Sequence, residues 1–259
     1  MADRPPKPAG FGVSHYFIIR RLHSLCGLVP VGVFLGVHLM IGASVLVRGA
    51  SGAEYQRTVG LIQGLGSILA PIEVFGILLP LAFHALLGLQ ITYCGEVSIH
   101  IYRYGGNVRF ALQRIAGIIA FVFILFHVWQ MHWLGEVLGG GVFDPLEAPG
   151  TTAAVIQSSW WVAPVYAVGV VASVYHLAAG IWTALITWGV AIRPRTQRVC
   201  GYLCTVFGIV LACIGLAALW GFRTLDLSTA EAGIAEIGRP GSPDLVSHRA
   251  FAVELEDTG

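Results

Sequence analysis

Five long apolar stretches follow one another along the chain. Each is long enough to cross the hydrocarbon core of a bilayer, which takes about 20 helical residues. The apolar runs are continuous, whereas the strands of a membrane β-barrel alternate at every second residue. The pattern predicts an all-α integral membrane bundle of five transmembrane helices, at about residues 22–47, 68–93, 115–138, 160–192 and 199–222.

The composition supports the same class of protein. Of the 259 residues, 11% are charged and 56% are apolar, whereas soluble domains carry roughly 25% charged residues. So few charges cannot cover the surface of a soluble enzyme of this length. The net charge of +1 provides no basic surface for nucleic acid. We therefore exclude a soluble enzyme, a disordered protein and a nucleic-acid binder.

Basic residues in the connecting segments predict the orientation, because Lys and Arg concentrate on the cytoplasmic side. With a cytoplasmic N-terminus, ten of the fifteen Lys and Arg residues fall on the inner side, where the net charge is +8, and the outer side has −7. We therefore expect the C-terminus outside. Residues 1–222 are expected to form the transmembrane domain, and residues 223–259 an acidic extension outside the membrane.

Each of the first four spans contains one histidine: His38, His84, His127 and His176. Ionisable residues inside a membrane are costly and mark functional sites by default. A helix rises about 1.5 Å per residue, which puts His38 and His127 in the outer half and His84 and His176 in the inner half. Depth therefore predicts two pairs, stacked across the bilayer. A histidine that merely packs remains an alternative for each one taken singly.

Two imidazoles from facing helices at one depth suit the iron of a haem b, which needs no cysteine attachment. Two such ligands fill both axial positions, so the expected role is one-electron transfer. Zinc prefers about four ligands at one point, which two separate pairs do not provide. Glycines beside the histidines, at positions 27, 88, 117 and 180, are expected to let a flat macrocycle approach the backbone.

Other polar residues lie at the two ends of the spans. At the inner edge we expect side chains that bind haem propionates or a quinone carbonyl, with purely topogenic charge as the alternative: Arg20, Arg21, His23, Ser24, Gln113 and Arg114. At the outer start of the second span, Glu73 is a candidate proton acceptor for a quinol. The alternative is an interfacial carboxylate that reaches water. His132, Glu136 and Asp144 are expected to be solvated.

The first two spans resemble the next two. Each hairpin opens with an Arg followed by a Gly and a His, and each returns with a His four residues before a Gly. The matching residues are Arg21, Gly27, His38, His84 and Gly88 in the first hairpin and Arg114, Gly117, His127, His176 and Gly180 in the second. The spacing predicts two antiparallel hairpins of similar structure.

Four motifs together resemble a known family. They are Arg20-Arg21-Leu-His23-Ser24 with Gly-Val-His38-Leu, Leu-Pro80-Leu-Ala-Phe-His84, Gln113-Arg114-Ile-Ala-Gly117 with Phe-His127-Val-Trp129, and Tyr-His176-Leu-Ala-Ala-Gly180. The chain is similar, over about residues 12–222, to the dihaem cytochrome b (b558-type) anchor subunit of succinate:quinone oxidoreductases (succinate dehydrogenase or fumarate reductase).

The resemblance implies that the four histidines are axial ligands of two haems b in a multi-pass subunit of a bacterial cytoplasmic membrane. It further implies a flavoprotein subunit, which carries the succinate-oxidising site, and an iron–sulfur subunit, both on the cytoplasmic face. Electrons would then pass to a membrane quinone, with menaquinone favoured over ubiquinone, and Glu73 would belong to an outer quinone site. Val174 and Tyr175 precede the last ligand, so the glutamate relay of some fumarate reductases is not carried over.

Two other functions remain open. One is a dihaem cytochrome b of another quinol-linked dehydrogenase, such as a hydrogenase or a formate dehydrogenase. The other is a proton-coupled transporter that uses buried histidines as a relay. Whether the complex forms a higher oligomer also stays open.

Overall fold

The computed structural model describes residues 13–47, 52–94 and 105–228. The extension expected at 223–259 lies outside the described residues from 229 onward. Every regular element in the described part is helical. In chain order the elements are α1 (Val13–Leu28), α2 (Pro30–Ala43), η1 (Ser44–Leu46), α3 (Ala53–Gln63), η2 (Gly66–Ile68), α4 (Leu69–Pro71), η3 (Ile72–Leu78), α5 (Leu79–Cys94), α6 (Gly105–Met131), η5 (Trp133–Leu138), η6 (Pro145–Glu147), α7 (Ala148–Gln157), α8 (Val162–Thr187) and α9 (Pro194–Thr224).

Five helical segments of the described chain are long and apolar enough to cross a membrane. They are Ile18–Leu46, Gly66–Tyr93, Val108–Met131, Val162–Thr187 and Pro194–Thr224. The predicted all-α bundle of five transmembrane helices is therefore confirmed.

The third span ends earlier than its apolar pattern predicts. Helix α6 stops at Met131 because His132 takes up an extended backbone conformation and its side chain accepts a hydrogen bond from the backbone N–H of Leu134. The chain then forms the tight turn η5, and the N–H of Gly141 returns to the carbonyl of Trp129 at 2.9 Å. The expected end near residue 138 is wrong, because the turn itself is apolar and the pattern does not mark the loop.

Proline interrupts the first two spans. A proline has no N–H to donate to the carbonyl four residues earlier, and α2 accordingly begins at Pro30, two residues after α1 ends. Before Pro80, the second span widens into the π-helix η3, and the N–H of Leu79 bonds to the carbonyl of Val74. Neither irregularity follows from the apolar pattern.

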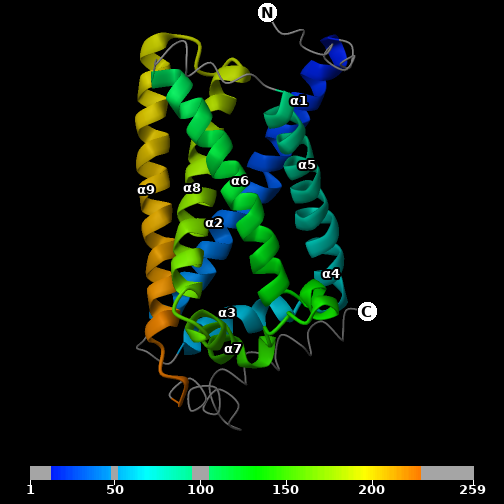
Figure 1. Cartoon of the computed structure of the whole chain (residues 1–259), viewed down its shortest axis with the longest axis vertical. Coiled ribbons are helices and arrows are strands. Elements are labelled where there is room, and N and C mark those ends of the chain that lie inside the picture. Colours follow the sequence, from blue (N-terminus) through cyan, green and yellow to red (C-terminus); the bar gives the residue numbers. More distant parts are fainter. Residues whose placement is uncertain (1–12, 48–51, 95–104, 229–259) are drawn as a thin grey trace, which may run out of the picture.

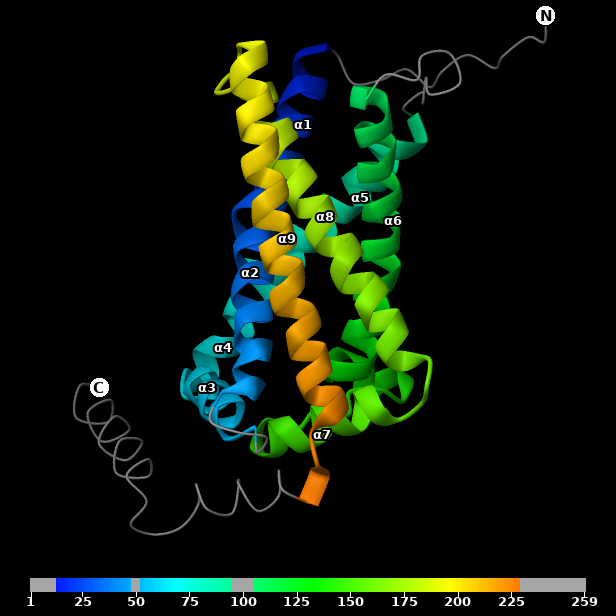
Figure 2. The same ribbon diagram turned by 90° about the vertical axis from the view of Figure 1, so that its left-hand side faces the viewer.

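Helix α8 lies at the centre of the bundle, with α9 and α6 beside it (Figures 1 and 2). Helix α2 packs along α9, and α5 lies mainly against α1. In the most apolar 18-residue stretch of α8, half of the residues are buried. In the corresponding stretch of the second span, no residue is buried. One core cluster joins α2, α8 and α9 through Leu39, Val170, Val174, Leu177 and Leu211. His176 therefore lies on the most buried of the five spans.

The two ends of the bundle carry opposite charge. We call the end where α1, α6 and α9 begin the basic end. Among the described residues it carries arginines and no Asp or Glu: Arg20, Arg21, Arg109, Arg114, Arg193, Arg195 and Arg198. The opposite end, here called the acidic end, carries Glu54, Glu73, Glu136, Asp144, Glu147 and Asp226, with Arg57 and Arg223.

Short helices close the acidic end (Figure 1). The side chain of Gln56 on α3 donates to the carbonyl of Pro145 at 2.8 Å and accepts from the N–H of Ala148 at 2.9 Å. The side chain of Gln157 on α7 donates to the carbonyls of Phe222 and Leu225. We call α3, η6 and α7 the cap. It packs on a second core cluster that includes residues of α8 and α9.

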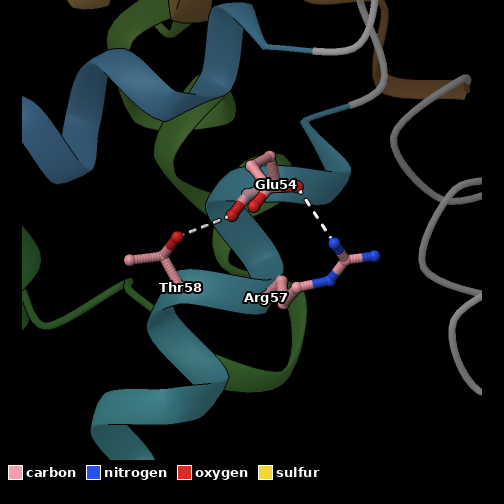
Figure 3. Close-up of polar contacts among 3 residues, drawn as sticks. All are labelled: Glu54, Arg57 and Thr58. Carbon is pink, nitrogen blue, oxygen red and sulfur yellow. Dashed lines mark hydrogen bonds and ion pairs between the residues drawn. The ribbon is translucent and has the colours of Figure 1, made fainter. Parts of the chain in front are cut away.

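The cap carries its own surface ion pair. Arg57 donates to Glu54 at 3.1 Å, and the hydroxyl of Thr58 bonds to the backbone carbonyl of Glu54 at 2.8 Å (Figure 3). Both charged side chains are about one quarter exposed. Pairs of this kind contribute about 0.2–1 kcal/mol, so apolar burial and the glutamine bonds hold the cap in place.

Candidate functional site

His84 on α5 and His176 on α8 lie side by side toward the basic end, and we call them the inner pair. Their ring centroids are 5.9 Å apart and their planes are inclined by 75°. Nδ1 of His84 lies 2.9 Å from the carbonyl oxygen of His23, and Nδ1 of His176 lies 2.9 Å from that of Gln113. A carbonyl oxygen only accepts hydrogen bonds, so both Nδ1 atoms carry the proton. Nε2 of each ring is left with a free lone pair.

Two glycines make room for the inner pair. A Cβ on Gly117 would lie 2.7 Å from Cε1 of His176, and a Cβ on Gly27 would overlap the ring of His84. Each glycine lies four residues after the residue whose carbonyl holds that ring. The two hairpins therefore share one local arrangement, as their spacing predicts. These two glycines admit an imidazole ring to the backbone, and the approach of a macrocycle there stays a prediction.

His38 on α2 and His127 on α6 form the outer pair, toward the acidic end. Their ring centroids are 5.7 Å apart, with an interplanar angle of 73°. Nδ1 of His127 lies 3.3 Å from the hydroxyl oxygen of Tyr166, and that hydroxyl donates to Oε1 of Gln130 at 3.1 Å. Because the hydroxyl proton is used on Gln130, the hydroxyl oxygen accepts from Nδ1–H of His127. Nε2 of His127 therefore also has a free lone pair.

His38 is held differently from the other three. Its ring packs against Phe34, with ring centroids 5.3 Å apart, and no described residue forms a hydrogen bond with it. A polar ring inside an apolar span that lacks a protein partner is costly unless another group binds it. The outer pair therefore combines one imidazole oriented by a side chain with one that the described protein leaves without a hydrogen bond.

The donor set fits the iron of a haem b. Each pair offers two imidazoles from different helices, and in three of the four rings the hydrogen bond at Nδ1 leaves Nε2 as the nitrogen that would bind a metal. Among the described residues no group of three or more His, Cys, Asp or Glu is placed to hold one metal ion. The pairs therefore do not make a structural zinc site, which needs about four ligands.

Two of the candidate residues at the inner edge, His23 and Gln113, contact the inner pair, chiefly through the backbone. The carbonyls of His23 and Gln113 orient the two rings, as described above. The ring of His23 stacks on that of His84, with centroids 4.1 Å apart, while the Gln113 side chain bonds to Thr183 at 3.4 Å. These contacts were not expected, since a propionate or a quinone was the predicted partner of both side chains.

Two arginines of the inner edge lie over aromatic rings. Arg21 lies over the ring of Trp188 at 5.4 Å, and Arg114 over that of Phe110 at 4.1 Å. Arg20 is exposed and Ser24 is half-buried on the same helix. Their binding of propionates or of a quinone stays a prediction.

At the acidic end, Glu73 of η3 lies beside the turn that follows α6. Its Oε2 is 3.4 Å from Nε1 of Trp133 and 3.7 Å from Nε2 of His132. We expected His132 to be solvated, but the structure shows its ring facing the carboxylate of Glu73. Glu136 and Asp144 are exposed, in agreement with expectation.

Sequence reasoning missed Tyr166, Gln130 and Trp133. Gln130 offers the best signal, because it is an amide three residues after His127 in the otherwise apolar stretch 115–131. Tyr166 and Trp133 resemble the aromatic residues common at membrane interfaces, so the sequence does not distinguish them from simple anchors.

Comparison with known proteins gives one clear relative. No family model matches the chain. The succinate dehydrogenase cytochrome b558 subunit of Bacillus subtilis (strain 168) is 34% identical over 206 residues, which is 80% of this chain and 96% of the relative. This likeness and the five apolar helices make the chain a multi-pass bacterial membrane protein and a subunit of an enzyme complex. The chain belongs to the family of succinate dehydrogenase cytochrome b558 subunits.

Proposed function

We propose that this subunit transfers electrons between the iron–sulfur subunit of a succinate dehydrogenase complex and a membrane quinone. Two haems b would serve as carriers, one held by His84 and His176 and the other by His38 and His127. The observation that carries the proposal is the pairing of four imidazoles at two depths, with Nε2 free in at least three. The name cytochrome b558 of the relative agrees with a haem b protein.

A haem b iron with two imidazole ligands has no open coordination position and therefore supplies one-electron transfer rather than O₂ chemistry. The chain's own residues would orient the ligands. A hydrogen bond at Nδ1 fixes the tautomer and makes Nε2 a more basic ligand. His23 and Gln113 would do this for the inner pair through their carbonyls, and Tyr166 for His127 through its hydroxyl.

The basic end is proposed to face the cytoplasm, with the N-terminus on that side and the C-terminus outside. Its arginines, with no described Asp or Glu beside them, suit the positive-inside rule. The flavoprotein and iron–sulfur subunits would dock on this end. Arg20, Arg21, Ser24 and Arg114 are then the residues proposed to bind haem propionates or a quinone, with the side chains of His23 and Gln113.

The acidic end is proposed to exchange electrons with the quinone. Glu73 is the proposed proton-exchanging group, since it is a carboxylate at the edge of an apolar span. By the family resemblance the quinone is a menaquinone rather than a ubiquinone. The relative's name favours succinate dehydrogenase over a hydrogenase or formate dehydrogenase.

Purification of the intact complex and quantitative haem analysis test the proposal. We expect a reduced-minus-oxidised spectrum typical of haem b, two haems per chain, and copurifying flavin and iron–sulfur clusters. Succinate should reduce at least one haem. Absence of a haem b band would overturn the cytochrome assignment. Haem without flavin or iron–sulfur partners would overturn the succinate dehydrogenase assignment alone.

A further inference from the structure

Three side chains from two elements meet at the acidic end, and we call them the Glu73 cluster: Glu73, His132 and Trp133. Nε1–H of Trp133 donates to Oε2 of Glu73 at 3.4 Å, and Nε2 of His132 lies 3.7 Å from the same oxygen. The rings of His132 and Trp133 also contact each other, with centroids 5.1 Å apart. Two ring nitrogens therefore lie close to the same carboxylate oxygen, Oε2 of Glu73.

The protonation of His132 follows from its other contact. Its Nδ1 accepts a hydrogen bond from the backbone N–H of Leu134 at 3.3 Å, so in the neutral ring the proton resides on Nε2. Burial lowers the pKa of His132, and the attraction of Glu73 opposes this only in part. The ring is thus neutral at neutral pH and presents Nε2–H to Glu73. Both ring nitrogens that face Oε2 carry a proton.

The other oxygen of Glu73 is free to react. No other described residue forms a hydrogen bond or an ion pair with Glu73, so Oε1 has no partner in the described chain. The side chains of Glu73 and His132 are 28% and 24% exposed, so the carboxylate is accessible from outside the bundle. Trp133 is 48% exposed and offers a flat aromatic surface beside the carboxylate, on which a quinone ring can stack.

The backbone fixes the cluster on both sides. Glu73 belongs to the first turn of the π-helix η3, an element that often occurs at functional sites. His132 and Trp133 belong to the turn that closes on the carbonyl of Trp129, where a Cβ on Gly135 or Gly140 would overlap that carbonyl. The approach of the two nitrogens to Oε2 is therefore a built feature of the fold and not a chance contact of mobile side chains.

We propose that His132 and Trp133 are positioning residues that hold Oε2 of Glu73, so that Oε1 exchanges protons with a quinone bound at the acidic end. The inference rests on the proposed function, which puts a quinone at this end. Reduction of a quinone to a quinol takes up two electrons and two protons. Succinate oxidation in the complex supplies the two electrons, and the protons enter at the acidic end.

Each proton passes in one balanced step. The O–H bond on Oε1 of Glu73 breaks, a quinol O–H bond forms, and the carboxylate is left ionised. The two N–H groups on Oε2 stabilise that charge. A proton taken up from the aqueous phase at the acidic end then returns to Oε1 before the second transfer. In quinol oxidation the same oxygen accepts the proton of the quinol.

The test uses the intact complex with succinate and a short-chain naphthoquinone. Glu73→Gln removes the proton-exchanging group and is expected to lower kcat about 100-fold. Trp133→Phe keeps the ring but removes the N–H, and is expected to lower kcat about 5- to 10-fold, as for the loss of one hydrogen bond. KM should change little, and the solvent deuterium isotope effect on kcat should rise, because proton transfer becomes limiting.

Two further comparisons separate positioning from a merely structural role. His132→Leu should resemble Trp133→Phe, whereas His132→Gln, which keeps an N–H donor, should restore most of the activity. Trp160→Phe changes a tryptophan that is 84% exposed outside the cluster and should leave kcat unchanged. The infrared band of the carboxylate, identified by its loss in Glu73→Gln, should shift in Trp133→Phe and not in Trp160→Phe.

The outcomes distinguish the two levels of the proposal. If Glu73→Gln leaves naphthoquinone reduction unchanged, the quinone function of this residue is wrong. If Glu73→Gln is inactive but Trp133→Phe keeps the wild-type kcat, isotope effect and infrared band, the positioning inference is wrong and the quinone site stands. If the His132→Leu complex fails to assemble, Trp133→Phe and His132→Gln still test whether the two residues position Glu73. Reduction of a phenazine dye by succinate reports that the catalytic subunits are intact.

Discussion

The inner and outer histidine pairs are similar in ring geometry but differ in what holds them. Both rings of the inner pair bond to backbone carbonyls at 2.9 Å, and both lie against glycines. In the outer pair, His127 bonds to a side-chain hydroxyl at 3.3 Å, and no described residue bonds His38. A backbone carbonyl cannot be removed by substitution, whereas a hydroxyl can. The inner pair is therefore the rigid site and the outer pair the adjustable one.

The difference matters for the proposed electron transfer. Hydrogen bonds to an imidazole ligand and the packing around it tune the affinity and potential of a bound metal. The outer pair lies toward the Glu73 cluster, where a quinone is proposed to react. Under the proposed function, the adjustable site lies on the side of the quinone and the rigid one on the side of the partner subunits.

The largest expected effect comes from removing one histidine ligand, which should abolish haem binding at that pair and leave the haem at the other pair. His84→Ala should leave one haem per complex, held by the outer pair, and His127→Ala should leave the one held by the inner pair. The reason is that a single remaining imidazole binds iron without a second axial ligand. Haem content and a redox titration measure this, with His132→Gln as a control that keeps both haems. Retention of two haems in both alanine variants would contradict the ligand assignment.

The next effect tests the glycines of the rigid site. Gly117→Ala puts a Cβ at 2.7 Å from Cε1 of His176, and Gly27→Ala forces a similar overlap with His84. We expect each variant to weaken haem binding at the inner pair by 10-fold or more, estimated from about 1.4 kcal/mol per factor of ten, and to spare the outer pair. The matched control is Gly42→Ala, whose Cβ would lie at an ordinary 3.5 Å from Ala218. Equal haem content in all three variants would contradict the inference that Gly27 and Gly117 make room for the imidazole rings.

A smaller effect is expected from the hydroxyl of the outer pair. Tyr166→Phe keeps the packing of the ring on Phe123 but removes the acceptor of His127. Loss of such a partner costs about 10- to 100-fold in metal affinity, so the outer haem should shift in potential and dissociate faster. Redox titration and haem release on dilution measure this effect. As a control, Tyr55→Phe removes a hydroxyl from the cap and should change neither the haem potential nor the rate of haem release. If Tyr166→Phe shifted only the potential of the inner haem, the assignment of Tyr166 to the outer pair would be wrong.

The smallest effects concern the cap over the acidic end. Gln56→Ala removes two hydrogen bonds that join α3 to the segment around Pro145 and Ala148, and should lower stability by about 1–3 kcal/mol. Because the cap packs beside Tyr166, the outer haem should be released before the inner one on heating. Glu54→Gln breaks only the surface ion pair with Arg57, which contributes about 0.2–1 kcal/mol. Thermal unfolding followed in the haem absorption band measures both, and simultaneous release of the two haems in Gln56→Ala would argue against the difference between the pairs.

The sequence predicts the fold class well because a bilayer accepts few solutions. Every backbone polar group of a spanning segment must be satisfied internally, so an uninterrupted apolar run of sufficient length can only be a helix. The ends of spans are less certain. The turn at Trp133–Leu138 is as apolar as the helix before it, and what stops α6 is the backbone conformation at His132. The cap was not predicted either, since α3 and α7 are short and owe their position to side-chain contacts with distant segments.

The sequence by itself determined the five spans and one histidine in each of the first four. It also predicted the depth of each histidine, because rise per residue converts position into height. Only the tertiary structure decided which nitrogen is free in three of the four imidazoles. The partner of His84 lies 61 residues away in the chain and that of His176 lies 63 away, and both are backbone carbonyls, which residue types do not distinguish. The same holds at Glu73, where the packing of η3 against the turn after α6 selects one carboxylate oxygen. Which nitrogen or oxygen is hydrogen-bonded depends on how the helices pack, and neither periodicity nor composition predicts it.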